Sequence, residues 1–317
     1  MKDLFHKLAG ILKNMRVGII DIGTNTFHLL IVDREQNNQV LHKEKVAVRI
    51  GANGISKGYI SDDAIDRAIE TLSRFRALLI EYGVSETTAT ATSAVRNAEN
   101  KHEFVQTIKE TTGIEIHVLS GDEEAFLIYQ GVKEYIDIQE PALIMDIGGG
   151  SIEFILADQD DVLWLRSYEI GGQRIIDQFH KSDPITAGET RLLNHFLGET
   201  LQEVFEKVKL FGAKYLIGSS GSFDTFWDIY TASHPEAHDT TPILSHDKFD
   251  EIHHDLIVKN KQERLAIPGM VRMRVDMIVG ASIVTQNVME NCHFDQIRIS
   301  PFALKEGVLY HGLSHTN

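Results

Sequence analysis

The sequence predicts an α/β protein made of two similar domains, each with a mixed β-sheet, and a cleft between the domains. The chain has 317 residues, which at roughly 150 residues per domain suggests two domains. Two segments that begin at Val17 and Ala142 are similar without a gap. Strands are expected to alternate with helices in both halves of the chain, which is typical of α/β domains.

The two similar segments are each predicted to form a β-hairpin, with a buried strand, a turn of small residues and a second apolar strand. Asp21 and Gly23 of the first segment are repeated as Asp146 and Gly148, 125 residues later. Chance similarity between two hairpins would match only apolar residues, whereas here the polar turn matches as well. We therefore expect a duplicated domain.

The remaining pattern supplies the helices and strands between and after the hairpins. Ser61, followed by Asp62 and Asp63, predicts the start of a helix whose apolar residues recur at helical spacing up to residue 79. We also expect a strand over 87–91, a polar loop over 92–99, a helix ending at 113, a strand over 114–118, helices near 188–211, a strand over 214–217, a helix over 274–290, a strand over 296–299 and a closing helix from 303. The expected domains are 1–137 with 303–317, and 138–302.

The composition excludes several classes of protein. The chain is 43% hydrophobic and 24% charged, and no apolar run approaches the roughly 18 residues of a membrane-spanning helix. The net charge of −15 has the wrong sign for binding a nucleic-acid duplex or an anionic membrane through the overall field. The single cysteine, Cys292, cannot form an internal disulfide, so we expect a cytoplasmic protein. The oligomeric state stays open, with a homodimer as one option.

The first 14 residues combine lysines with one apolar helical face. Their apolar runs are too short for a signal peptide. We interpret them as a short packing helix or as an extension before a start at Met15, in preference to an anchor on a membrane surface.

The run Asp146-Ile-Gly-Gly-Gly-Ser151 is the first candidate for chemistry. Backbone N–H groups of successive glycines can converge on an anion, and a serine can add a hydroxyl donor; these candidates are Gly148, Gly149, Gly150 and Ser151. An acid beside bound phosphate would repel it unless a divalent cation lay between them. We therefore expect Asp146, helped by Glu153, to contact Mg²⁺. The alternative is a hairpin turn with a solvated acid.

The equivalent turn of the first hairpin carries Asp21 as a matching metal candidate and side-chain donors at Thr24, Asn25 and Thr26. Two such turns that face each other across a cleft would hold a phosphate chain from both ends. A third loop of small residues precedes a predicted helix, where N-terminal amides favour anions; its members are Gly218, Ser219, Ser220 and Gly221. Three such loops make phosphate binding the leading hypothesis.

Two neighbouring acids at the start of another predicted helix have different expected roles. Ser120 and Glu123 have the spacing of a capping box, so Glu123 is expected to turn back toward the Ser120 amide. Glu124 points about 100° away around the helix and could take a proton from an attacking water. The alternative is that both acids only favour the helix dipole.

Among the basic residues, Arg96 lies in the predicted polar loop, where a guanidinium could bind phosphate with two hydrogen bonds. Similar candidates with fewer supporting features are Arg49, Arg174, Arg274 and Lys305. The 15 histidines are scattered and show no metal-ligand spacing.

These motifs together resemble the exopolyphosphatase and guanosine pentaphosphate phosphohydrolase family (the Ppx/GppA phosphatases), within the actin, sugar-kinase and Hsp70-like ATPase superfamily. The resemblance runs from about residue 16 to 313. It implies two duplicated ribonuclease-H-like domains and Mg²⁺-dependent hydrolysis of the terminal phosphoanhydride of polyphosphate, or of guanosine pentaphosphate. It also implies that Glu124 is the catalytic base, that Arg96 contacts phosphate, and that Asp146 and Glu153 bind the metal.

Two other classes of function remain open. A kinase of the same superfamily would need an ATP site and insertions that bind an acceptor, for which this compact chain has little room. A noncatalytic sensor of polyphosphate or guanosine alarmones would bind tightly without releasing phosphate. The sequence does not choose between polyphosphate and guanosine pentaphosphate, because both present a terminal phosphoanhydride.

Overall fold

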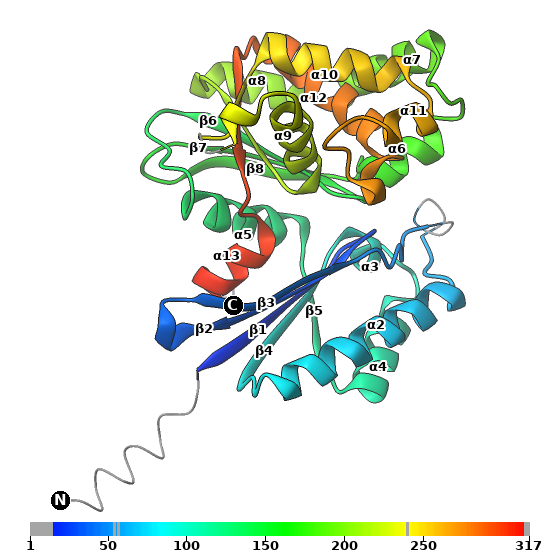
Figure 1. Cartoon of the computed structure of the whole chain (residues 1–317), viewed down its shortest axis with the longest axis vertical. Helices are drawn as coiled ribbons and strands as arrows, with labels where there is room; N and C mark the ends of the chain where they lie inside the picture. Colours follow the sequence, from blue (N-terminus) through cyan, green and yellow to red (C-terminus); the bar gives the residue numbers. More distant parts are fainter. Residues whose placement is uncertain (1–14, 53–54, 56–57, 239–240, 314–317) are drawn as a thin grey trace, which may run out of the picture. The chain divides into compact units, whose positions relative to one another are not determined.

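The computed structural model describes residues 15–52, 55, 58–238 and 241–313 (Figure 1). These residues form two compact units that divide between Leu119 and Ser120. Each unit is built around one mixed sheet, which confirms the predicted α/β class. The segment 1–14 and its alternative interpretations lie outside the described residues. In the described part of the chain, no helix has the length and apolar character needed to cross a membrane.

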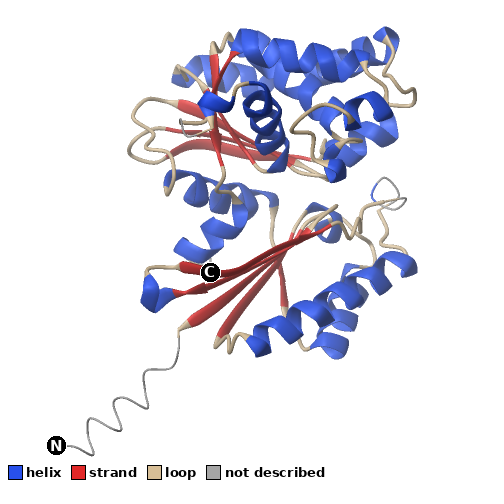
Figure 2. Ribbon diagram, in the orientation of Figure 1, coloured by secondary structure: helices blue, strands red, loops and turns tan. Residues whose placement is uncertain are grey.

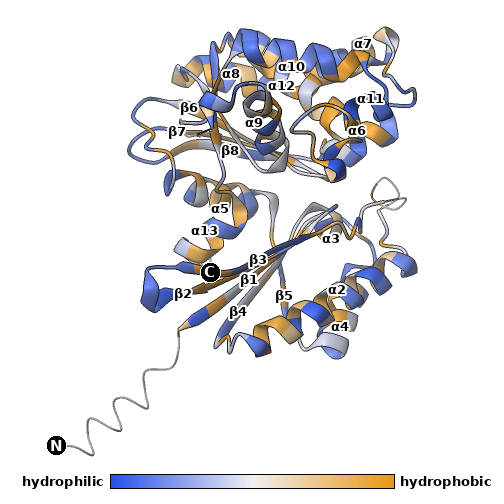
Figure 3. Ribbon diagram, viewed as in Figure 1, coloured by the Kyte–Doolittle hydropathy of each residue, from blue (hydrophilic) through white to orange (hydrophobic). Residues whose placement is uncertain are grey.

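The first unit is a five-stranded sheet with helices packed against it. Its elements are β1 (Arg16–Ile22), β2 (Phe27–Asp33), η1 (Arg34–Gln36), β3 (Gln39–Val46), α2 (Asp62–Glu81), β4 (Glu86–Ala91), α3 (Ser93–Arg96), α4 (Lys101–Thr112) and β5 (Ile116–Val118). The strand order is β3-β2-β1-β4-β5, with antiparallel pairs among the first three and parallel pairs among the last three. Helix α2 alternates hydrophobic and hydrophilic stretches (Figure 3), because Ala68, Leu72, Phe75 and Leu79 form one buried face.

The second unit is a six-stranded sheet, and helices supply most of its remaining residues (Figure 2). Its elements are α5 (Gly121–Lys133), β6 (Ala142–Ile147), β7 (Ile152–Ala157), β8 (Val162–Tyr168), α6 (Gly172–Gln178), α7 (Ala187–Thr200), α8 (Gln202–Phe211), β9 (Leu216–Ser219), α9 (Gly221–Ser233), η3 (Pro235–Ala237), β10 (Ile243–Ser245), α10 (His246–Val258), α11 (Lys261–Leu265), η4 (Arg272–Arg274), α12 (Ile278–Cys292), β11 (Gln296–Ser300) and α13 (Leu304–His311). The strand order is β10-β11-β9-β6-β7-β8.

The central strands of this second sheet have different chemistry on their two faces. Successive side chains of a strand point to opposite faces. Met145 and Ile147 of β6, with Ile152 and Phe154 of β7, belong to the main hydrophobic core. Asp146 and Glu153 alternate with these residues and therefore lie on the opposite face, where α5 contacts β7 and β8.

The backbone confirms the predicted duplication. Strands β3-β2-β1-β4 of the first sheet correspond in order to β8-β7-β6-β9 of the second. The turn of the first hairpin is closed by a hydrogen bond from the Gly23 amide to the Thr26 carbonyl, at 3.1 Å. The equivalent bond in the second hairpin, from Gly148 to Ser151, is 3.0 Å long. The same 125-residue offset therefore relates both the sequence and the hydrogen bonding of the two turns.

Helices α5 and α13 pack against each other through two glycines. A Cβ atom on Gly131 would lie 2.1 Å from the Ala303 carbonyl oxygen, and one on Gly307 would lie 1.8 Å from the Leu127 carbonyl oxygen. Any larger side chain would therefore separate the helices. Both helices lie in the second compact unit. The division into a domain of residues 1–137 with 303–317 and a domain of 138–302 stays a prediction. The cleft expected between these domains also stays a prediction.

Two local predictions were wrong. Residues 92–99 are not a loop throughout, because Ser93–Arg96 form one helical turn in which Ser93, Ala94 and Val95 are buried. The helix expected from Arg274 begins at Ile278 instead. The Arg274 and Met277 amides bond to carbonyls three residues earlier, those of Val271 and Arg274, and this tighter winding precedes the α-helix.

The predicted small-residue loop does join a strand, β9, to a helix, α9, and it contains an unusual backbone conformation. Ser220 has φ 69° and ψ 176°, a region in which residues other than glycine are strained by about 1–3 kcal/mol. Its hydroxyl donates to the Ile147 carbonyl, at 3.2 Å. A strained residue held beside the end of β6 fits the loop's predicted role in binding.

We expect S220G to be more stable than S220A by about 1 kcal/mol, since both variants lose the hydroxyl and only glycine relieves the strain at positive φ. Urea unfolding followed by tryptophan fluorescence reports on the second unit, which contains both tryptophans, Trp164 and Trp227. Equal stability of the two variants would contradict the strain argument.

Candidate functional site

At the start of α5, the neighbouring acids Glu123 and Glu124 have different environments, as predicted. The Ser120 hydroxyl accepts a hydrogen bond from the Glu123 amide at 3.2 Å, and the Glu123 carboxylate accepts one from the Ser120 amide at 2.8 Å. Glu123 is therefore used in the capping box. Glu124 lies one residue further around the helix and is buried, with 6% of its surface exposed. A buried carboxylate on the face that packs against a sheet is an unusual helix residue and points to a function.

Two more acids face each other across the central strands of the second sheet. Asp146 of β6 pairs directly with Glu153 of β7, and both side chains are buried. The Ser219 hydroxyl donates to Asp146 Oδ2 at 2.6 Å. The Ser167 hydroxyl donates to Glu153 Oε1 at 2.7 Å. Each carboxylate therefore receives a hydroxyl hydrogen bond from a neighbouring strand.

Burial and mutual repulsion control the charge of these acids. Burial raises the pKa of Glu153 well above its ordinary value, and the charges of Glu124 and Asp146 raise it further. Burial also raises the pKa of Asp146, while hydrogen bonds from Ser219 and Ser220 and the charges of Arg274 and Lys305 act against this increase. The three carboxylates therefore form one electrostatically linked group within the second unit.

The glycine-rich turn between β6 and β7 is oriented by the start of α6. The carbonyls of Gly148, Gly149 and Gly150 accept hydrogen bonds from the amides of Gly172, Gln173 and Gly171, at 2.8–3.2 Å. In a planar trans peptide the N–H points opposite to the C=O. The amides that follow these carbonyls therefore point away from α6; they belong to Gly149, Gly150 and Ser151. Such a set of donors that point away from α6 suits an anion.

Close packing keeps this turn in place. A Cβ atom on Gly171 would lie 2.5 Å from the backbone of Gly150 and Ser151. The Arg174 side chain donates from Nε to the Gly150 carbonyl at 2.9 Å and forms an ion pair with Glu169. Arg174 thus stabilises the backbone of the turn through this hydrogen bond.

Arg274 has a more prominent position than its sequence context suggested. It is buried, and a Cβ atom on Gly221 would lie 2.2 Å from its Nη2 atom, so its guanidinium covers the start of α9. Burial lowers its pKa, while the charges of Asp224 and Asp146 act in the opposite direction. Its Nε atom has no hydrogen-bond partner within the described residues. This buried cation beside Asp146 could bind an anion.

The candidates of the first unit also lie close to one another at the end of its hairpin. Thr24 and Asn25 are buried, and their carbonyls accept hydrogen bonds from the amides of Gly51 and Arg49 at 3.0 and 2.9 Å. The Thr26 hydroxyl lies 3.2 Å from His28 Nε2.

The remaining first-unit candidates are on strand β1 and helix α3. Asp21 pairs across the sheet with His28. Arg96 ends helix α3, and its guanidinium donates to the Leu119 carbonyl at 3.3 Å. The structure therefore groups these candidates in one unit and the three linked carboxylates in the other. The expected meeting of the two groups stays a prediction.

The donor set of the second unit fits Mg²⁺. In the part of the chain that the structure describes, no three His, Cys, Asp or Glu side chains converge as ready metal ligands. Mg²⁺ commonly binds to one or two carboxylates and keeps several waters or substrate phosphates as further ligands. Asp146 and Glu153, which pair directly across β6 and β7, have the oxygen atoms that such a site would need. Asp21, the third predicted ligand, lies in the first unit.

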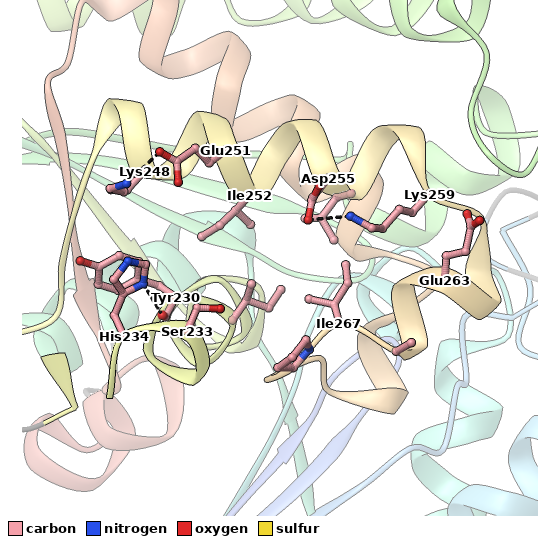
Figure 4. A pocket seen from close by; sticks show the side chains of 14 residues that line it. Tyr230, Ser233, His234, Lys248, Glu251, Ile252, Asp255, Lys259, Glu263 and Ile267 are labelled. Atoms are coloured by element: carbon pink, nitrogen blue, oxygen red, sulfur yellow. Dashed lines mark hydrogen bonds and ion pairs between the residues drawn. The ribbon is translucent and has the colours of Figure 1, made fainter. Parts of the chain in front are cut away.

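A separate hollow lies between α9, α10 and the segment around α11 (Figure 4). Its volume is about 370 Å³, and its apolar lining includes Ile229, Ile252 and Ile267. Charged side chains on its rim form ion pairs with one another: Lys248 with Glu251 at 2.8 Å, and Lys259 with Asp255 at 2.6 Å. Because these charges neutralise each other, the hollow is a weaker candidate for a catalytic site than the group of acids on the sheet.

The sequence prediction missed Ser167 and gave Arg274 only a minor place. Ser167 lies on β8, outside every recognised motif, and only the strand register shows that it neighbours Glu153. Arg274 lies outside any glycine-rich loop, so its burial could not be predicted from local sequence.

Solved structures similar to this chain include an exopolyphosphatase from Cytophaga hutchinsonii, with 40% identity and a TM-score of 0.89, over 93% of this chain and 96% of that one. The Aquifex aeolicus member of the Ppx/GppA family has the same fold, with 23% identity and a TM-score of 0.75, over 93% and 96% of the two chains.

Two relatives identified by sequence are also similar along most of this chain. Exopolyphosphatase 1 of Mycobacterium tuberculosis is 26% identical over 300 residues, which cover 93% of this chain and 87% of the relative. A bifunctional 3-dehydroquinate synthase/phosphatase of Fusobacterium nucleatum is 30% identical over 314 residues, or 93% of this chain. The chain spans only 46% of that longer protein.

The sequence model of the Ppx/GppA phosphatase family matches residues 30–316, which is most of the chain. This match begins within β2 and includes strands β3 to β11, the glycine-rich turn and the acid-bearing helix α5. The expected family of phosphoanhydride hydrolases is thereby confirmed, and the chain belongs to the Ppx/GppA phosphatase family.

Proposed function

We propose that the protein is an exopolyphosphatase, which hydrolyses the terminal phosphoanhydride of inorganic polyphosphate and releases orthophosphate. The observation that carries this proposal is the group of three buried, electrostatically linked carboxylates beside a glycine-rich turn with aligned amides. The chemistry requires an anion site, a site for a divalent cation and a base for water. In this proposal the glycine-rich turn is the anion site. Asp146 and Glu153 form the cation site, and Glu124 is the base.

The phosphate would be held by the amides of residues 149–151, with the hydroxyl of Ser151, and by the start of α9 with Arg274. A bound Mg²⁺ on Asp146 and Glu153 would neutralise the charge that develops on the phosphoryl oxygens. Arg96 and the donors at 24–26 would hold the next phosphates if the two units close on the substrate. Glu124 would orient a water for in-line attack and accept its proton. The main acceleration comes from fixed charges and dipoles, as is usual in phosphoryl transfer.

The choice of polyphosphate as the substrate is supported by the similar proteins. Both the Cytophaga hutchinsonii structure at 40% identity and the Mycobacterium tuberculosis relative at 26% identity are described as exopolyphosphatases. Guanosine pentaphosphate is the second candidate, because its terminal phosphoanhydride suits the same anion site. A cytoplasmic location and a homodimer stay predictions.

We expect E124Q to lower turnover about 10²- to 10⁴-fold, because an amide cannot accept the proton from water. The measurement is the rate of phosphate release from polyphosphate with Mg²⁺ at saturating substrate. E123Q is the matched control, since glutamine preserves the capping box and should leave turnover close to wild type. A near-wild-type rate for E124Q would remove Glu124 from the mechanism without affecting the assigned fold.

We expect Mg²⁺ to stabilise the second unit, by about 2.7 kcal/mol when its concentration is 100 times the Kd. E153Q should lose most of this stabilisation. In EDTA, E153Q should instead be more stable than wild type by about 1 kcal/mol, because glutamine removes a carboxyl group whose charged form is disfavoured by burial and by the directly opposed Asp146. Urea unfolding followed by tryptophan fluorescence measures both effects, with KCl at equal ionic strength as the control for screening. Equal stabilisation of both proteins by Mg²⁺ would exclude Glu153 as a ligand.

Phosphate release should be measured side by side on short polyphosphate, long polyphosphate and guanosine pentaphosphate. We expect the largest kcat/KM with polyphosphate; a larger value with guanosine pentaphosphate would establish the second candidate. Consumption of ATP that depends on an added acceptor would favour a kinase. Tight binding of all three compounds without phosphate release, with Mg²⁺ present, would favour a noncatalytic sensor.

A further inference from the structure

The two acids on the second sheet belong to a row of four polar residues that crosses four adjacent strands. Ser219 of β9 pairs with Asp146 of β6, Asp146 with Glu153 of β7, and Glu153 with Ser167 of β8. All four therefore lie at the same level of the sheet. The two acids occupy the middle of the row, and a serine stands at each end.

The end serines hold the middle acids in fixed orientations. Directly opposed like charges destabilise a sheet, and burial increases their repulsion. Each acid accepts a short hydrogen bond from the serine on its outer side, at 2.6 Å for Asp146 and 2.7 Å for Glu153. One oxygen of each carboxylate is therefore tied to an adjacent strand. The rotation of both carboxylates is restricted before any ligand binds.

The duplicated sheet of the first unit shows that the topology does not require this row. Its equivalent positions, in the same register, carry Thr90, Asp21, His28 and Lys45. A histidine and a lysine there replace the second acid and the second serine. The Thr90 hydroxyl donates to the Ile20 carbonyl at 3.4 Å. Paired acids with a serine on either side are therefore a feature of the second unit, where the acids face α5.

Ser167 also contacts the helix that carries Glu124. A Cβ atom on Gly121 would lie 2.6 Å from the Ser167 Cβ atom and 3.2 Å from its hydroxyl oxygen. Gly121 is the first residue of α5, three positions before Glu124. The same serine therefore bonds to Glu153 and sets how closely the start of α5 approaches β8.

We infer that Ser167 and Ser219 are positioning residues, which orient Glu153 and Asp146 to bind a divalent cation. This inference rests on the cation site of the proposed function. Ser167 is assigned no contact with substrate, and the hydroxyl of Ser219, whose loop is predicted to bind phosphate, donates to Asp146 in this structure. Residues that orient metal ligands through a hydrogen bond commonly change metal affinity by 10- to 100-fold when they are replaced.

The test measures cation binding without substrate, so that it does not depend on catalysis. Mn²⁺ serves as the probe, and electron paramagnetic resonance quantifies the unbound ion in titrations of the full chain. We expect S167A and S219A each to bind Mn²⁺ about 10- to 100-fold more weakly than wild type. S282A is the matched control, because Ser282 is also buried and donates to a carbonyl, at 2.8 Å, on α12. Its Mn²⁺ affinity should equal that of wild type.

The same titration with D146N separates this inference from the proposed function. Lost binding in D146N together with wild-type affinity in both serine variants would overturn the positioning role and leave the cation site intact. Wild-type binding in D146N would overturn the cation site and the inference with it. With polyphosphate as substrate, S167A should raise the Mg²⁺ concentration for half-maximal activity about 10-fold or more. Its turnover at saturating Mg²⁺ should stay close to wild type, since the serine touches no reacting atom; a loss of turnover alone would contradict positioning.

Discussion

The burial of Asp146 and Glu153 side by side on neighbouring strands is the constraint on which the rest of the second unit depends. Two adjacent buried carboxylates are unfavourable unless the surrounding structure compensates for their burial and repulsion. Here β6 and β7 are buried along their whole length, and the opposite face of both strands is part of the main hydrophobic core. The stability of that core allows the other face to carry charges that would not persist on an isolated hairpin.

Several neighbouring groups stabilise the pair Asp146 and Glu153. Serine hydroxyls donate hydrogen bonds to one oxygen of each acid, and the positive charges of Arg274 and Lys305 favour the ionised form of Asp146. The negative charge that remains supports the proposed binding of a divalent cation next to amides that suit a phosphate. Glu124, the proposed base, enters this group from helix α5, which packs against α13 as well as against β7 and β8.

Features encoded by adjacent residues were the most predictable from sequence. The hairpins, the capping box of Ser120 and Glu123, and the strand-to-helix position of the loop at 218–221 all depend on local patterns, and the structure contains each of them. The register that aligns Ser167 with Glu153 depends on pairing between strands, and its partners carry no motif. The burial of Arg274 depends on an approach to Gly221 from a distant segment. Such contacts have no local signature, so the sequence could identify the acids but not the residues that hold them.

The contact of Gly131 with Ala303, and of Gly307 with Leu127, joins segments that are far apart in the chain. Because each glycine makes room for the backbone of the other helix, the two positions cannot vary independently. In related proteins, a side chain at one position should occur only together with a wider separation of the helices or a change at the other. Residues near the end of the described chain therefore help to set the position of the helix that carries Glu124.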